Sequence, residues 1–320
     1  MTSALPAYDV LTVGEPMVLF MATEPGALHS VPNFARAAAG AELNVAIGLS
    51  RLDIKTAYIT RLGNDSFGRY LRAELASNGI GTDYVSQDDA HRTGFMLKTR
   101  SIDGSDPEIE YFRAGSAASH LCVDDLPSGF PARHLHVTGI TPALTASTLA
   151  MIVELMARAR AAGASISFDP NLRPALWPSQ AVMADTLNRL AAHADLVLPG
   201  IAEGKILMGS QDPATIADFY LRNGAKQVVV KLGAEGAYYQ TRSGDTVSHG
   251  TVAGVPAAQV VDPVGAGDGF AVGVISGLLE GLSLPDAIAR GNAIGSRVVQ
   301  FPGDSDGLPT RTQLNLSPRD

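Results

Sequence analysis

The sequence contains one cysteine, Cys122, among its 320 residues. An internal disulfide is therefore impossible, and we expect the chain to work in a reducing, cytoplasmic compartment. Basic residues are fewer than acidic ones, 24 against 32, and the formal net charge is −8. A nucleic-acid surface needs clustered Lys and Arg, so we expect no nucleic-acid partner. The first ten residues also lack the basic region and apolar core of a signal peptide.

Several motifs with known chemistry are missing as well. No G-x-x-x-x-G-K-[ST] phosphate loop and no G-x-S-x-G motif occurs. Gly265-x-Gly267 begins like a dinucleotide fingerprint, but Phe270 stands where the third glycine belongs. His134 and His136 alternate along an expected strand with no third ligand nearby, so a structural role is favoured over a metal site. These absences disfavour a P-loop enzyme and a nicotinamide enzyme.

One apolar stretch, residues 264–282, approaches the length of a membrane span and has glycines four residues apart. Asp268 and Glu280 would lie inside such a span, and no other segment resembles one. We therefore expect a buried helix with a small-residue face, packed closely on a neighbour, and no membrane partner.

With 46% hydrophobic residues, the chain can form a large core. Strand-like and helix-like segments alternate along most of it, which predicts an α/β fold with a mostly parallel sheet covered on both faces. Ligands bind such sheets beyond the carboxyl ends of the strands. Strands are expected at 8–14, 56–61, 134–138, 165–169, 195–198 and 227–231, with a hairpin at 236–241 and 246–249. Helices are expected from about 43 onward and at 67–77 (capped by Ser66), 145–162, 179–192, 202–208, 213–223, 266–279 and 284–299.

Two regions interrupt this alternation. Residues 93–100 and 108–113 read as a hairpin whose turn is 103–107. Together with short extended pieces between 16 and 33, they predict a small sheet that stands off the main body. We expect a single domain over 1–320, with this second sheet formed by about 16–36 and 91–115.

The most informative stretch is DPVGAGDGF at 262–270. A glycine-rich turn that feeds a helix start directs free backbone N–H groups at an anion, and the helix dipole adds to them. Asp268 lies at this helix start, where it could serve as a catalytic base beside a phosphate. The helix start should favour its ionised form. The competing interpretation is a carboxylate cap on a structural helix.

The stretch DPVGAGD at 262–268 resembles the C-terminal signature of the ribokinase-like (PfkB) carbohydrate kinases. GAELN at 40–44 resembles their N-terminal glycine signature, and the resemblance runs from Gly14 to Asp306. Four further stretches are similar to those of 2-keto-3-deoxygluconate kinases within that family. They are YFRAGSA at 111–117, HVTGITPAL at 136–144, DPNLR at 169–173 with Trp177, and Gly303-Asp304.

The resemblance implies a three-layer ribokinase-like α/β domain with a β-sheet lid. It also implies ATP-dependent phosphorylation of 2-keto-3-deoxy-D-gluconate to its 6-phosphate, with Mg²⁺. Asp268 would be the general base, and the turn of Gly265, Ala266 and Gly267 would stabilise the transferred phosphoryl group. Because guanidinium groups match carboxylates, Arg113 and Arg173 suit an acidic sugar.

By the same resemblance, the substrate would meet Gly40, Asn44, Tyr111, Arg113, Ile140, Arg173, Asp268 and Asp304. ATP would meet Asn171, Arg173, Lys231, Gly233, Gly236, Gly265, Gly267 and Asn292. Glu203 would act on Mg²⁺ through water. Lid sheets of this family often pair between subunits, so a homo-oligomer is expected.

Three positions depart from the family pattern. Ala39 replaces a paired glycine, Gly200 replaces the asparagine of an N-x-x-E motif, and Met96 stands where some relatives have a tyrosine that contacts substrate. Met96 weakens the prediction of the sugar more than that of the reaction. A fructokinase, a kinase for a related deoxy sugar acid, and a non-catalytic sugar-acid sensor therefore remain alternatives.

Overall fold

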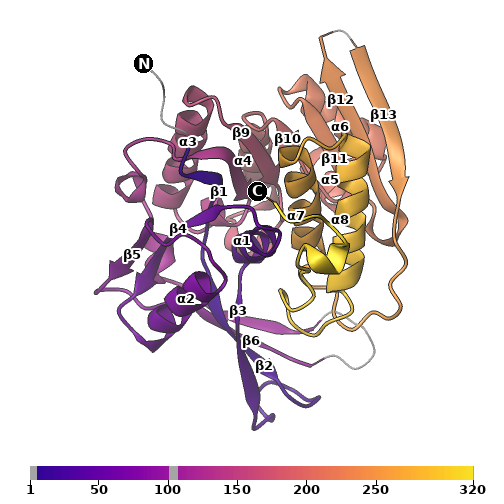
Figure 1. Cartoon of the computed structure of the whole chain (residues 1–320). Helices are drawn as coiled ribbons and strands as arrows, with labels where there is room; N and C mark the ends of the chain where they lie inside the picture. Colours follow the sequence, from indigo (N-terminus) through magenta and orange to yellow (C-terminus); the bar gives the residue numbers. More distant parts are fainter. Residues whose placement is uncertain (1–5, 101–106, 245, 320) are drawn as a thin grey trace.

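A computed structural model of the chain describes residues 6–100, 107–244 and 246–319. Its centre is a nine-stranded sheet with the order β13-β12-β11-β10-β9-β8-β1-β4-β5 (Figure 1). Neighbours from β11 to β5 run parallel, and β12 and β13 are antiparallel. The strands are β1 (Tyr8–Val13), β4 (Thr56–Gly63), β5 (Val85–Asp88), β8 (Ala132–Thr138), β9 (Ser165–Asp169), β10 (Leu196–Val197), β11 (Gln227–Lys231), β12 (Gly236–Ser243) and β13 (Thr246–Ala253).

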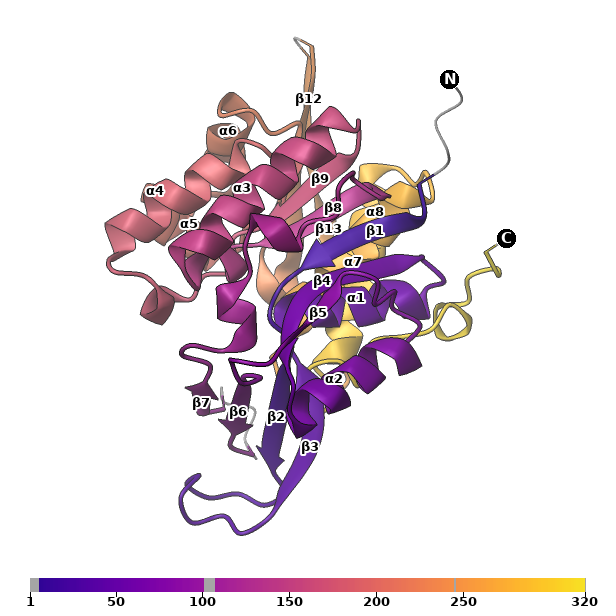
Figure 2. The same ribbon diagram turned by 90° about the vertical axis from the view of Figure 1, so that its left-hand side faces the viewer.

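Helices cover both faces of this sheet, as Figures 1 and 2 show. On one face lie α3 (Ala146–Ala161), α4 (Gln180–Ala191), α5 (Ile201–Met208) and α6 (Pro213–Arg222). On the other lie α1 (Ala41–Arg51), α2 (Ser66–Ser77), α7 (Ala266–Leu279) and α8 (Leu284–Val298). The predicted three-layer α/β fold with a mostly parallel sheet is confirmed.

The strands read as continuous apolar runs because each face of the sheet is buried under helices. In β11, Val228 and Val230 join the core on the α3–α6 side, whereas Val229 joins the core on the α7–α8 side. This alternation is the period of two that a strand imposes on its side chains.

Helix α7 has the bounds that the sequence predicts, and residues Asp268–Gly277 are buried. A methyl group on Gly273 would collide with the backbone of Gly291 in α8, so the small face lets these two helices approach closely. No helix among the described residues is long and apolar enough to cross a membrane.

The second sheet has four strands in the order β3-β2-β6-β7 and projects from the main body (Figure 2). Its strands are β2 (Met17–Ala22), β3 (Phe34–Ala39), β6 (Phe95–Lys98) and β7 (Ile109–Phe112). The expected hairpin is present, since β6 and β7 pair antiparallel. Residues 103–106 of its expected turn at 103–107 lie outside the described residues. Strand β3 extends beyond the expected boundary at 36.

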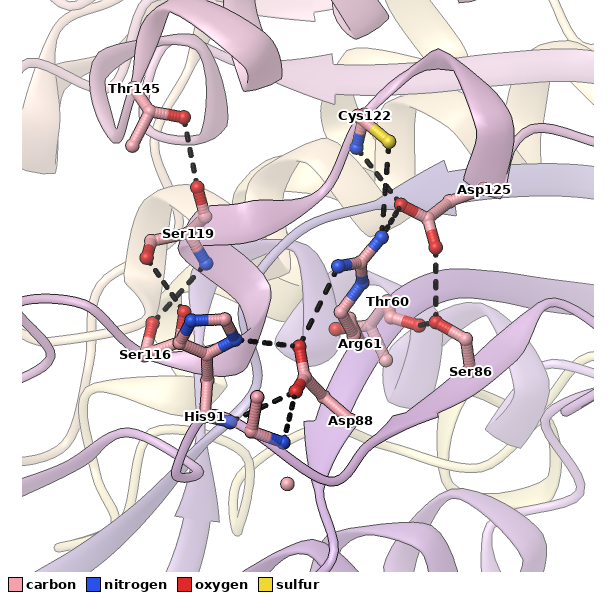
Figure 3. Close-up of polar contacts among 12 residues, drawn as sticks. Thr60, Arg61, Ser86, Asp88, His91, Ser116, Ser119, Cys122, Asp125 and Thr145 are labelled. Atoms are coloured by element: carbon pink, nitrogen blue, oxygen red, sulfur yellow. Dashed lines mark hydrogen bonds and ion pairs between the residues drawn. The ribbon is translucent and has the colours of Figure 1, made fainter.

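Polar contacts anchor the two segments that enter and leave the β6–β7 hairpin (Figure 3). From β4, Arg61 reaches Asp88 at 3.6 Å and Asp125 at 2.6 Å. Asp88 ends β5, just before the segment that enters β6, and it bonds the ring of His91 at 3.0 Å. Asp125 lies after β7 and accepts the backbone N–H of Cys122. One arginine therefore joins the entering and the leaving segments.

The cap of α2 and two strands differ from the sequence-based predictions, whereas a histidine pair agrees with them. Asp65, rather than Ser66, caps α2, since its side chain accepts the N–H of Gly68. The short strands β3 and β5 were not predicted, because neither has a strong apolar alternation. The interpretation of the His134 and His136 pair as structural agrees with their contacts: Ser165 and Ser167 hold their rings, and burial lowers the pKa of each ring to about 3.

Candidate active site

A polar cavity of about 330 Å³ lies beyond the carboxyl ends of β1, β8, β9 and β11, where the small sheet meets the main body. Each of these strands delivers side chains to it, as parallel sheets are expected to do. All eight residues predicted to bind substrate line it: Gly40, Asn44, Tyr111, Arg113, Ile140, Arg173, Asp268 and Asp304. Asn171, Lys231, Glu203, Gly265 and Gly267 line it too.

Asp268 is the third residue of α7 and lies on the cavity wall, 9% exposed. The amide of Asn44 donates to its Oδ2 at 2.8 Å, and the amide of Asn171 approaches its Oδ1 at 3.4 Å. Asn44 comes from α1 and Asn171 from the loop after β9, so three distant segments meet at this carboxylate. The arrangement fixes the carboxylate in orientation and leaves it facing the cavity.

The protonation of Asp268 differs from the sequence-based expectation. Burial raises its pKa to about 7; the hydrogen bond from Asn44 opposes this, and the nearby Asp169 carboxylate adds to it. The helix start was expected to favour the ionised form, but removal from water outweighs the helix dipole here. A carboxylate with this pKa can accept a proton near neutral pH and later release it.

The loop after β9 forms the next part of the wall. Asp169, the last residue of β9, pairs with Lys231 of β11 at 2.6 Å, and its other oxygen accepts the N–H of Asn171. Burial alone would lower the pKa of Lys231, but the carboxylates of Asp169 and Glu203 outweigh it and raise the pKa. Lys231 is therefore a permanently charged group at the junction of β9 and β11.

The two arginines differ in how their charge is compensated. Arg113 is ion-paired with Glu15, which lies two residues after the end of β1. Arg173 donates to the backbone carbonyls of Leu172 and Asn171. Within the part of the chain that the structure describes, Arg173 has no carboxylate partner at ion-pair distance. Arg173 is therefore the guanidinium whose charge is left for an anion.

A second cavity, of about 430 Å³, adjoins the first and is mostly apolar. Lys231 and Gly267 line both cavities. The remaining residues predicted for the nucleotide side, Gly233, Gly236 and Asn292, line the second one, and so does Ala266 of the predicted catalytic turn. The amide of Asn292 already donates to the carbonyls of Val252 and Ala253, so it fixes strand β13 against α8.

Glu203 caps α5 and also lines the first cavity. Its two oxygens accept the backbone N–H groups of Gly200 at 2.6 Å and Leu172 at 2.9 Å. Burial raises its pKa, and Asp169 adds to the effect. Among the described residues there is no group of three or more acidic, His or Cys side chains that could hold a metal by itself. A divalent cation in this cavity would therefore have to be held mainly by phosphates and water, and Glu203 is a carboxylate that could face it.

Two of the three departures from the family pattern fall on the cavity or its edge. Met96 is 4% exposed and lines the cavity beside Tyr111, its partner on β7. Ala39 ends β3, fully buried, next to Gly40. Gly200 lies outside the cavity wall and serves as the start of α5.

Several charged residues of this site were not predicted from the sequence. Glu15 and Glu42 line the cavity, and Glu42 accepts the hydroxyls of Thr138 and Thr141. Burial raises the pKa of Glu42. Lys98, which is 1% exposed, pairs with Asp304 at 2.8 Å. The position of Glu15 at a strand's carboxyl end was a usable signal. Nothing in the local sequence marks Lys98 as buried.

Comparison with known proteins agrees with this geometry. A family model described as pfkB family carbohydrate kinase matches residues 8–311. A 2-dehydro-3-deoxygluconokinase from Bacillus subtilis (strain 168) is 50% identical over 96% of this chain and 94% of its own length.

Solved structures show the same likeness. A PfkB protein from Polaromonas sp. JS666 is 50% identical, with a TM-score of 0.89 over 97% of this chain and 100% of that one. A fructokinase from Vibrio cholerae O395, bound to fructose, ADP and a calcium ion, is 26% identical, with a TM-score of 0.83 over 96% of this chain and 98% of that one. The chain belongs to the pfkB family and is a carbohydrate kinase.

Proposed function

We propose that this kinase transfers the γ-phosphoryl group of ATP to the terminal hydroxyl of 2-keto-3-deoxy-D-gluconate and forms the 6-phosphate. The observation that carries the proposal is the composition of one cavity: a buried carboxylate of raised pKa, Asp268, shares it with two arginines, Arg113 and Arg173. Arg173 can serve the phosphates of ATP, but a neutral sugar has no charged group for Arg113 to bind. The relative from Bacillus subtilis, 50% identical, is named for the same sugar acid.

In this proposal, Asp268 takes the proton of the sugar's terminal hydroxyl as its oxygen attacks the γ-phosphorus. The new O–P bond forms while the bond between that phosphorus and the β–γ bridging oxygen breaks, and ADP leaves with the electron pair. Phosphoryl transfer requires alignment and charge stabilisation more than covalent help. The N–H groups of the Gly265–Gly267 turn and the ammonium of Lys231 would receive the developing negative charge.

The two arginines would act at different ends of the cavity. Arg173 influences the pKa of Asp268, so it lies near the reacting atoms and would meet the phosphates. Arg113 instead pairs with Glu15 and lowers the pKa of Glu42 and Tyr58, so its charge acts on a different group of residues. Arg113 would therefore meet the substrate carboxylate, and Tyr111, Gly40, Asn44, Ile140 and Asp304 would surround the rest of the sugar.

ATP would lie with its base in the apolar second cavity and its phosphates at the shared wall of Lys231 and Gly267. Mg²⁺ bound there would neutralise phosphate charge, with Glu203 holding it through water. The four-stranded sheet would serve as a lid over the sugar, within a single kinase domain. Its outer face would pair with a second copy of the chain in a homo-oligomer.

A substrate panel with ADP formation as the readout tests the proposal. The panel contains 2-keto-3-deoxy-D-gluconate, a related deoxy sugar acid, and fructose, each with Mg-ATP. We expect the highest kcat/KM with the first compound. Faster turnover of fructose would replace the sugar-acid assignment with a fructokinase, and binding of the sugar acid without ADP formation would indicate a sensor.

A further inference from the structure

Lys98 joins the small sheet to the main body through two carboxylates. It is the last residue of β6, and its side chain is only 2% exposed. Its ammonium lies 2.5 Å from Asp262 and 2.8 Å from Asp304. Asp262 precedes α7 and Asp304 follows α8. One side chain from the small sheet therefore bridges two loops of the main body, one before α7 and one after α8. No step of the proposed reaction uses this lysine.

Both acidic residues support the turn that begins α7, Asp262 through its carboxylate and Asp304 through its backbone. Asp262 accepts the backbone N–H of Val264 at 3.0 Å, inside the turn itself. The backbone of Asp304 packs so closely on Gly265 that a methyl group there would collide with the Asp304 carbonyl. Gly265 has a φ of 84° and is the residue from which α7 starts, three positions before Asp268. The turn is thus supported from two sides by residues that share the same ammonium.

The charges of this cluster depend on one another. Two carboxylates this deeply buried repel each other, and a cation between them compensates that repulsion. Burial alone would lower the pKa of Lys98, but Asp304 and Asp262 outweigh it and raise the pKa. The cluster therefore keeps one positive and two negative charges, and its net charge is about −1.

We propose that Lys98 is a positioning residue that couples the seating of the small sheet to the geometry of the phosphate turn. When β6 lies over the cavity, the ammonium of Lys98 holds Asp262 and Asp304 together and thereby fixes the positions of the Gly265–Gly267 N–H groups. When β6 moves away, both carboxylates lose their cation and the turn loosens. The inference rests on the proposed role of that turn in receiving the phosphoryl group.

The test compares Lys98→Ala with the wild type and with Lys226→Ala, using whichever sugar the wild type phosphorylates best. That choice keeps the test valid if the sugar-acid assignment fails. Lys226 is a suitable control because its side chain is 70% exposed in its ion pair with Asp195. The pair lies at the amino ends of β10 and β11, whereas the cavity lies beyond the carboxyl ends of the strands. We expect kcat of Lys98→Ala to fall at least ~10-fold, with a smaller change in KM for the sugar, because misplacement of reacting groups acts mainly on the transition state.

Chemical rescue separates a charge role from a packing role. Ammonium chloride should restore kcat of Lys98→Ala several-fold over sodium chloride at the same ionic strength, because an ammonium ion can enter the space between the two carboxylates. The wild type and Asp268→Asn should show no such response. Lys98→Met fills the volume without the charge, so wild-type kcat in that variant would overturn the proposal, as would a folded Lys98→Ala with wild-type kcat.

A variant that fails to fold would still leave a decisive measurement. Lys98→Met combined with Asp262→Asn removes one charge of each sign and keeps the net charge of the cluster, and asparagine can still accept the Val264 N–H. The proposal expects this double variant to fold, with a melting temperature near that of the wild type and with a reduced kcat. A wild-type kcat in the folded double variant would refute the positioning role.

Discussion

Glu15 holds the guanidinium of Arg113 through a single carboxylate oxygen. The Nε and Nη2 atoms of Arg113 lie 2.7 Å and 2.5 Å from Glu15 Oε2. The other oxygen, Oε1, is buried without a hydrogen-bond partner among the described residues. This oxygen packs against Gly94, where an added methyl group would lie 2.5 Å from it. Glu15 therefore partly neutralises the Arg113 cation, and both residues line the cavity.

Removing the charge of Glu15 should favour an acidic substrate. In Glu15→Gln, Arg113 keeps its position next to an amide but is no longer neutralised. We expect KM for the sugar acid to fall several-fold and KM for fructose to change little.

Arg113→Met should raise KM for the sugar acid by about 10- to 100-fold, the size of a lost charge-assisted bond. Glu15→Gln with Arg113→Met is the matched control, since it leaves no unpaired buried charge. Equal effects on both sugars would rule out Arg113 as the carboxylate reader.

The raised pKa of Asp268 predicts that activity increases with pH, whereas the contribution of this group to folding stability decreases with pH. The base must be ionised, so kcat/KM should fall as pH drops below about 7. The folded pKa lies above the ordinary value of 3.8, so this group favours folding at low pH and loses that contribution as pH rises through about 7. Asp268→Asn should lower kcat by at least ~10²-fold and should raise the melting temperature more at pH 8 than at pH 5. A melting temperature that is unchanged at every pH would contradict the raised pKa.

Asn44 should control the pH at which kcat/KM falls on the acidic side. Its amide donates to Asp268 Oδ2 at 2.8 Å and opposes the rise in pKa. Asn44→Ala removes a bond to the ionised form, so the acidic limb of kcat/KM should move upward by about one pH unit. Activity should recover in part at pH 9, which a purely structural defect would not allow. Asn223→Ala, an exposed amide that caps the end of α6, should leave the profile in place.

The connection between the two sheets should be sensitive to acid. Burial alone would raise the pKa of Asp88, but bonds from the ring and backbone of His91 and from the backbone of Ala90 lower it to about 2. Because this value lies below the ordinary 3.8, Asp88 stabilises the fold above about pH 4 and loses that effect as pH falls toward 2. Asp88→Asn should lower the melting temperature at pH 6 and flatten its fall between pH 4 and 2. Thermal melts followed by circular dichroism measure both, with Asp89→Asn as the neighbouring control.

Local pattern was sufficient for most elements of the main sheet. Strands β9 and β11 and helix α7 have the bounds that the sequence predicts, because apolar runs and a glycine-rich turn mark them within a few residues. Strands β3 and β5 were missed because their pairing depends on neighbours rather than on their own pattern. Strand β3, FARAAA, forms only because β2 supplies a partner along its whole length.

Local pattern and family resemblance were enough to predict most strands and helices, the turn at 262–268 with Asp268 in the first turn of its helix, and many of the residues that line the cavity. How the charges of those residues combine depends on the tertiary fold. Glu15 meets Arg113 across 98 positions, and Lys98 meets Asp304 across 206. The raised pKa of Asp268 likewise comes from burial by segments far away in sequence. Periodicity and turn chemistry act over a few residues, whereas ion pairs and desolvation depend on which distant segments the fold brings together.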